Sequence, residues 1–319
     1  MEQTYYLIIM GALIVEYVLS TTSSVLNMNS ITKAVPDGFH EYYDQEKYAK
    51  SQAYLRNKTR FGLISGLFSL IITLIVIHTG VFGILDELVR SNSSHTITSG
   101  LIFFGILFIL NDIINLPFSI YGTFVIEEKY GFNKTTVKTF LSDKLKGYGL
   151  TIVLGSIVII PVLYFFDSYG SNGWWIAWSL ITAFMIAVQP LFVHVIAPMF
   201  NKFTPLEDGE LRTSIEEFAG KVNFPIGRID VMDGSRRSAH SNAYFSGFGK
   251  SRRIALFDTL LDKHSTEEIV SVVAHEVGHY KKKHVITGTV LGILETGLML
   301  YIFNYFMTDQ ALFNVFGVQ

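Results

Sequence analysis

Six long apolar runs separated by polar segments dominate the chain. They lie at residues 5–26, 62–85, 99–121, 147–167, 173–200 and 285–307. Each is long enough to cross a bilayer core of about 30 Å as a helix. The first run is the weakest, because Glu16 and the polar cluster at residues 20–24 interrupt it. It has no basic leader and no small-residue cleavage site, so we expect a retained span.

Polar side chains recur inside these runs. They are Asn111, Asp112, Asn115, Gln189, His194 and Glu295. Such groups are costly in lipid and either hydrogen-bond between helices or face a hydrated cavity. Four prolines in the same runs, Pro117, Pro161, Pro190 and Pro198, are expected to kink or end their helices. Together these features predict a helical bundle that encloses a chamber.

The basic residues predict the orientation of this bundle. Lys and Arg number six in residues 27–60, five in 122–146 and thirteen in 201–284. The alternating connections at 86–98 and 168–172 carry one and none. Since basic loops stay in the cytoplasm, the three basic segments are predicted to be cytoplasmic.

Residues 201–284 form the sizeable water-facing segment. We expect a helix at 206–222 and strands at 228–232, 241–245 and 253–257. Gly247 and Gly249 lie between the last two strands and predict a hairpin turn. The outer edge of such a hairpin can accept an extended peptide as a further strand. A small sheet without any ligand is the alternative.

Composition agrees with this division. Half of the 319 residues are hydrophobic and 16% are charged, too apolar a balance for an ordinary soluble enzyme. A net charge of −2 gives no reason to expect nucleic acid. The fold class is therefore mainly α, with a small cytoplasmic α+β segment. We place a membrane domain of five spans at 1–200 and a second domain, with the sixth span, at 201–319.

Candidate chemistry lies in an H-E-x-x-H run, His275-Glu276-Val277-Gly278-His279. On a helix, positions i and i+4 are about 40° apart, so both imidazoles can reach one ion. The chain has no cysteine, so any zinc must be held by histidine and carboxylate. Glu276 is placed to take a proton from a water that the metal activates. This pattern predicts a zinc metallopeptidase with one Zn²⁺ per chain.

The helix that carries this motif has a clear start signal. Ser265 is an expected N-cap, and Glu268 follows three residues later as in a capping box. Apolar residues then recur at helical spacing. A buried amphipathic helix with two incidental histidines is the simpler alternative. Two further hypotheses are a transporter or channel with a polar pathway, and an inactive scaffold that binds peptides.

The chain closely resembles the type I CAAX prenyl proteases, integral-membrane zinc endopeptidases. The resemblance rests on residues 48–61, 130–134, 200–206, 241–245 and 258–261 together with the zinc helix. It implies His275 and His279 as zinc ligands and Glu276 as catalytic base. It also implies that Asn242, with Ala243 and Tyr244, holds the substrate backbone.

The resemblance further implies a fold and a reaction. Family members enclose a large intramembrane chamber with seven helices and hydrolyse a peptide bond near the C-terminus of a membrane-associated protein. The implied partners are the lipid bilayer and a peptide or protein substrate, prenylated or not. The implied location is the inner membrane in a prokaryote or the endoplasmic reticulum in a eukaryote.

One family feature has no counterpart in the sequence. The third zinc ligand of the family is a glutamate in an E-x-x-x-D helix after a seventh span, and nothing after His279 matches it. Glu295 would lie about 24 Å from His279 on a continuous helix. His284 would lie on the opposite helix face from His275. We therefore expect the third ligand beyond Gln319, on a missing C-terminal part.

Overall fold

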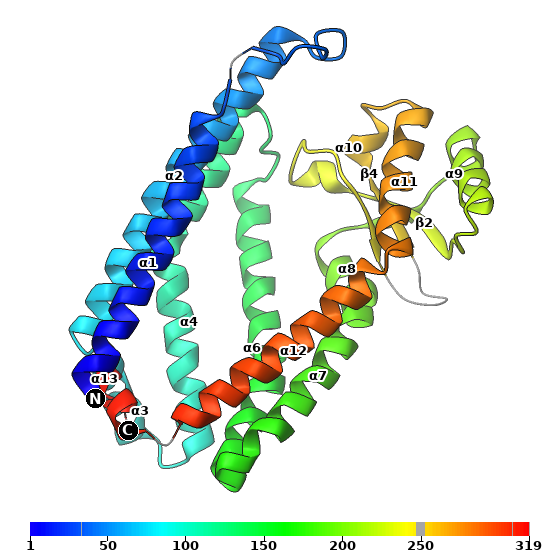
Figure 1. Cartoon of the computed structure of the whole chain (residues 1–319). Helices are drawn as coiled ribbons and strands as arrows, with labels where there is room; N and C mark the ends of the chain where they lie inside the picture. Colours follow the sequence, from blue (N-terminus) through cyan, green and yellow to red (C-terminus); the bar gives the residue numbers. More distant parts are fainter. Residues whose placement is uncertain (33, 247–252, 308, 319) are drawn as a thin grey trace. The chain divides into compact units, whose positions relative to one another are not determined.

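The structure, a computed structural model, is mainly helical with one small sheet (Figure 1). It describes residues 1–32, 34–246, 253–307 and 309–318. The chain forms two compact units, Met1–Gly131 with Phe306–Gln319 and Phe132–Tyr305. The domain boundary predicted between residues 200 and 201 lies inside the second unit.

Within the described residues, six helical stretches are long and apolar enough to span a membrane. They are Glu2–Asn29, Gln45–His78, Thr96–Tyr130, Val137–Tyr169, Gly173–Phe200 and His284–Phe306. Each coincides with a predicted run, which confirms the mainly helical, six-span fold class. Many Leu, Ile, Val and Phe side chains on these stretches are exposed, as lipid-facing positions require. The protein is a multi-pass integral membrane protein.

The predicted end of the second span is wrong. Helix α2 (Gln45–His78) stops seven residues before residue 85, and α3 (Val81–Asn92) follows as a separate helix. Gly80 between them adopts φ 71°, a left-handed conformation that glycine takes without a steric cost. The apolar run is continuous in sequence, so only this backbone turn separates the two helices.

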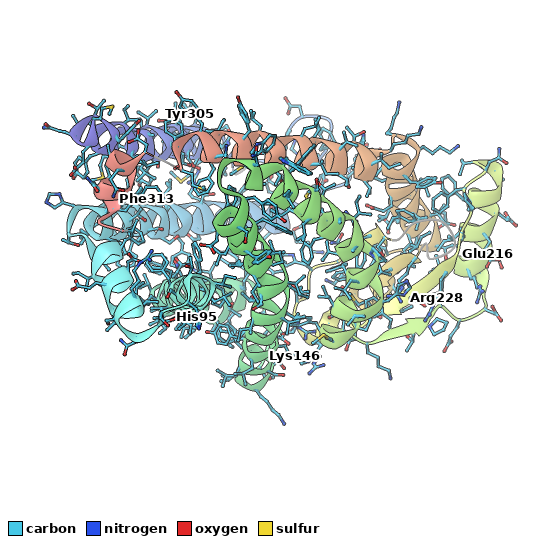
Figure 2. All side chains as sticks on the ribbon, turned by 90° about the horizontal axis from the view of Figure 1, so that it is seen from below. His95, Lys146, Glu216, Arg228, Tyr305 and Phe313 are labelled. Atoms are coloured by element: carbon cyan, nitrogen blue, oxygen red, sulfur yellow. The ribbon has the colours of Figure 1, made fainter. Side chains whose placement is uncertain are left out.

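In the first unit, the short C-terminal helix α13 (Gln310–Phe316) packs against α1 (Glu2–Asn29) and α3. Figure 2 labels Phe313 on this helix. The hydroxyl of Tyr5 donates to Asp309 Oδ2 at 2.6 Å. The backbones of α3 and α13 approach so closely that a Cβ on Gly83 would lie 2.5 Å from the Gly317 carbonyl oxygen. The two chain ends are therefore packed together in this unit.

Two of the four prolines precede a local widening of the helix. The helical segments concerned are α4 (Thr96–Tyr121), η1 (Gly122–Glu127) and α5 (Glu128–Tyr130), and then α7 (Gly173–Leu191), η3 (Phe192–Ile196) and α8 (Ala197–Phe200). Pro117 precedes η1 and Pro190 precedes η3, and both η segments are π-helical. Proline removes a backbone donor, and a π turn is one way to accommodate the loss. Helix α6 (Val137–Tyr169) contains Pro161 and continues past it.

The soluble segment of the second unit contains a four-stranded sheet in the order β1-β2-β4-β3. Its elements are β1 (Phe203–Pro205), α9 (Glu210–Lys221), β2 (Arg228–Met232), β3 (Ala243–Ser246), β4 (Arg253–Phe257), α10 (Asp258–Leu261) and α11 (Thr266–Lys281). The predicted helix and the three predicted strands are confirmed, within a few residues. Strands β3 and β4 pair antiparallel as the hairpin requires, although its turn at residues 247–252 lies outside the described residues.

One face of this sheet is apolar and the other carries a charge. Helices α9 and α11 pack together, and their side chains bury Ile229, Ile254 and Leu256 in a common core. On the opposite face, the fully buried Asp230 accepts a hydrogen bond from Arg228 Nε at 2.7 Å. Arg253 Nε lies 3.0 Å from its other oxygen, at ion-pair distance. The sheet thus holds α11 by hydrophobic burial.

Candidate metal and peptide site

Helix α11 begins as its sequence predicts. Ser265 Oγ accepts from the Glu268 backbone N–H at 3.3 Å, and Glu268 Oε2 accepts from the Ser265 backbone N–H at 3.0 Å. This is a complete capping box. The hydrogen bond from the Ser265 backbone lowers the pKa of Glu268. Ile269, Val273 and Val277 then point into the core. The opposite face of α11 does not take part in this core, so its side chains can bind a ligand.

His275 and His279 lie on that free face and point toward each other. Their Nε2 atoms are 3.1 Å apart, their ring planes are at 71°, and both residues are exposed. Two nitrogen ligands of a tetrahedral zinc with bonds of about 2.0–2.1 Å are separated by about 3.3 Å. The two imidazoles are therefore already at ligand spacing, and the donor pair fits zinc.

Glu276 is half-buried beside the pair, and its carboxylate has no hydrogen-bond or ion-pair partner among the described residues. It is therefore available to accept a proton. No group of three His, Cys, Asp or Glu side chains in the described ranges could hold a metal. Helix α12 (His284–Phe306) runs without a break, which places Glu295 about 16 Å along its axis from His284. Glu295 is thus excluded as a ligand that joins His275 and His279.

His284 does not lie where a continuous helix would place it. Helix α11 ends at Lys281, and Lys283 adopts φ 56° before α12 begins. The ring of His284 then packs edge-on against His279, with the two Nδ1 atoms 2.8 Å apart. The sequence argument assumed an unbroken helix, and the structure replaces that helix with a turn at Lys283. His284 still contacts the outer nitrogen of His279, away from His275.

Strand β3 lies against α11 and at the edge of the sheet, so no described strand pairs with its outer side. The Asn242 carbonyl accepts from the Phe257 backbone N–H at 3.0 Å, which makes these two residues a hydrogen-bonded pair. In an antiparallel ladder such pairs alternate, so Tyr244 also faces β4. The backbones of Ala243 and Phe245 consequently point outward, where an extended peptide could pair.

The three sequence-predicted peptide-binding residues have different surroundings. Asn242 is exposed, and its Oδ1 accepts from the Ala243 backbone N–H at 2.9 Å. The Ala243 side chain is buried in the core and its N–H is taken by Asn242, so its outward carbonyl is the group left to meet a ligand. The Tyr244 hydroxyl lies 3.9 Å from Met232 Sδ, and burial raises the pKa of this phenol. Tyr244 therefore offers a side-chain surface rather than a free backbone.

A pocket of about 380 Å³ opens beside β3. It is lined by Val188, Gln189, Phe192, Val193, Tyr244, Phe245, Ser246 and Val285. The sequence analysis singled out Gln189 and Tyr244 but not the other lining residues. Folding alone brings α7, η3, β3 and α12 together around this pocket. The pocket is mostly apolar, so it can bind an apolar side chain of a peptide that pairs with the β3 edge.

These features define a class: a polytopic membrane protein with an H-E-x-x-H helix packed on a small mixed sheet. Two family models agree with it. One, "CAAX prenyl protease N-terminal, five membrane helices", matches residues 25–202, and the other, "Peptidase family M48", matches residues 205–319. The chain belongs to the CAAX prenyl protease 1 family within peptidase family M48.

Several relatives are similar along most of this chain. CAAX prenyl protease 1 of Saccharomyces cerevisiae is 37% identical over 294 residues, which cover 89% of this chain and 65% of that protein. The human homologue is 31% identical, with 90% and 70% covered. The crystal structure of Saccharomyces mikatae Ste24p matches with a TM-score of 0.87 at 36% identity, covering 94% of this chain and 72% of that one. The chain spans less than two thirds of the length of the S. cerevisiae protein.

Proposed function

We propose that this chain is the membrane and metal-binding part of a zinc-dependent endopeptidase. The main support is the 3.1 Å distance between His275 Nε2 and His279 Nε2 on an exposed helix face. Two side chains alone are a weak metal site, so a third ligand from a segment outside this chain belongs to the proposal. Zinc, when bound, acts as a Lewis acid that activates water and polarises a carbonyl.

The chain's own residues would do the remaining work. Glu276 accepts a proton from the attacking water on a carboxylate oxygen and passes it to the leaving amine nitrogen. The outward carbonyl of Ala243 and the outward backbone of Phe245 hold the peptide as an added strand, and Asn242 offers the N–H groups of its side-chain amide beside them. Together they would keep the scissile bond in register with α11.

The proposed substrates are proteins with a prenylated C-terminus. The support is family membership, since the relatives carry the name CAAX prenyl protease. The mostly apolar pocket beside β3 suits an aliphatic side chain, which a C-a-a-X sequence supplies at two positions. The excess of Lys and Arg in residues 201–284 supports a cytoplasmic location for the α11 segment. The relatives compared are eukaryotic, which favours the endoplasmic reticulum over a prokaryotic inner membrane.

Metal content of the detergent-purified protein, produced together with the segment that supplies its third ligand, tests the proposal. We expect one zinc per chain, its loss in His275→Ala and its retention in Glu276→Gln. If zinc does not bind, or binds equally well to His275→Ala, the metallopeptidase assignment fails. Cleavage of a farnesylated C-a-a-X peptide by the protein with its third ligand should then vanish in Glu276→Gln.

A peptide-binding scaffold is the second candidate. The observation in its favour is that no third ligand joins His275 and His279 in the described residues. A scaffold binds peptide at the β3 edge and cleaves none, even when zinc is bound and the full ligand set is present. Cleavage that Glu276→Gln abolishes excludes it.

A further inference from the structure

We infer that His284 is a positioning residue that holds His279 in the one tautomer able to bind a metal through Nε2. This inference rests on the proposed metal site and adds a residue that is not itself a ligand. Its basis is a chain of three imidazoles. His284 Nδ1 lies 2.8 Å from His279 Nδ1, and His279 Nε2 lies 3.1 Å from His275 Nε2.

The backbone builds this chain at the junction of two helices. The Lys282 N–H closes α11 on the Gly278 carbonyl at 3.0 Å, and the Lys283 N–H bonds to the Tyr280 carbonyl at 2.9 Å. Lys283 takes a positive φ of 56°, which is unusual for a residue with a side chain. The chain then turns into α12, so that His284 comes back against the last turn of α11.

The number of protons on the two rings decides which histidine donates the hydrogen bond between the Nδ1 atoms. A neutral imidazole carries one N–H and one lone pair, and two Nδ1 atoms at 2.8 Å share one proton. If His284 donated that proton, His279 would carry its own proton on Nε2 and would have no lone pair for a metal. The arrangement that frees His279 Nε2 has His279 Nδ1–H donating and His284 Nδ1 accepting.

The contact also orients the ring. A metal-binding histidine usually donates its second N–H to a carboxylate, a carbonyl or a water, which fixes ring rotation and raises ligand basicity. No hydrogen bond or ion pair from His279 to an Asp or Glu is found in the described residues, and His284 occupies this place. Removal of such an outer partner typically weakens metal binding by about 10–100-fold.

Three variants of the protein with its third ligand present test the inference, with zinc affinity measured by competition with a chromophoric chelator. His284→Leu removes the acceptor and should weaken zinc binding by about 10–100-fold. His284→Asn restores an acceptor, since its Oδ1 can take the place of Nδ1, and should return most of the affinity. His95→Leu is the matched control: His95 is exposed at the start of α4, and this variant should bind zinc like the original chain.

Cobalt(II) gives a second readout that a purely structural role would not change. In His284→Leu the visible bands of bound Co²⁺ should shift or weaken, while thermal unfolding stays within a few degrees of the original. Zinc binding by His284→Leu at full strength, alongside its loss in His275→Ala, overturns the inference and leaves the metal site intact. Equal weakening in the Leu and Asn variants also overturns it. If the original protein, with its third ligand present, binds no zinc, the proposed function fails and this inference fails with it.

Discussion

Arg237 forms a bidentate ion pair with Asp143: its Nε lies 2.7 Å from Oδ2 and its Nη2 lies 2.9 Å from Oδ1. The same guanidinium donates to Asn201 Oδ1 at 2.8 Å and to the Phe200 carbonyl at 2.7 Å. The hydrogen bond to Asp143, together with the negative charge of that carboxylate, raises the pKa of Arg237. One side chain therefore joins α6, the end of α8 and the loop before β3 within the second unit.

Arg237→Lys should destabilise the protein by about 2 kcal/mol, because an ammonium cannot replace a bidentate fork and four hydrogen bonds. Thermal unfolding in detergent measures this as a lower Tm. The matched control is Arg212→Lys on α9, whose exposed pairs with Asp208 and Glu216 should leave Tm almost unchanged. Equal effects of the two substitutions would contradict a special role for Arg237.

The capping box of α11 predicts a pH dependence. The pKa of Glu268 is lowered in the folded state, so its stabilising effect is complete above the unfolded value of about 4.3 and disappears as pH falls through the lower folded pKa. Glu268→Ala should lower Tm at neutral pH, and this Tm difference should shrink as pH falls below about 4.3. Glu268→Gln keeps an acceptor for the Ser265 backbone N–H, and its Tm should not change in this way with pH. A Tm difference between Glu268→Ala and the original protein that stays constant from neutral to acidic pH would contradict this prediction.

The packing of α7 on α12 depends on a glycine. Trp178 donates its indole N–H to the Ile293 carbonyl at 2.8 Å, and a Cβ on Gly297 would lie 2.9 Å from the same indole. Gly297→Ala should destabilise the chain by about 1–3 kcal/mol by displacing Trp178. Gly288→Ala on the same helix meets nothing within 4 Å and should be neutral or slightly stabilising. Tm and tryptophan fluorescence measure both, and Gly297→Ala without a fluorescence change would count against this contact.

The pocket beside β3 predicts a selective loss of peptide affinity. Val188→Phe would fill part of the roughly 380 Å³ and should weaken binding of an aliphatic C-terminal peptide about tenfold. Zinc content should not change, because the metal pair lies on α11. Val195→Phe is the control, since Val195 is exposed on η3 and does not line the pocket. Isothermal titration with the peptide separates the two variants, and equal affinities would remove the pocket from the binding site.

The site itself was only partly predictable from sequence. His275 and His279 are four residues apart, and the helix that brings their rings together follows from its own capping box and apolar spacing. Local hydrogen bonds decide that geometry. The contact of His284 with His279 was not predictable in this way, because a single positive φ at Lys283 interrupts the continuous helix that the sequence argument assumed.

Local patterns in the sequence were enough to predict the six apolar spans, the strands β2 and β4 and the paired histidines, because each of these features depends on residues close together in the chain. The surroundings of these features depend on contacts between distant segments. Long-range pairing set β2 parallel to β4 and left β3 at the sheet edge, and packing brought Val188 and Val285 to one pocket. These contacts join residues about 25 to 100 positions apart, so no local pattern of apolar and polar side chains specifies them.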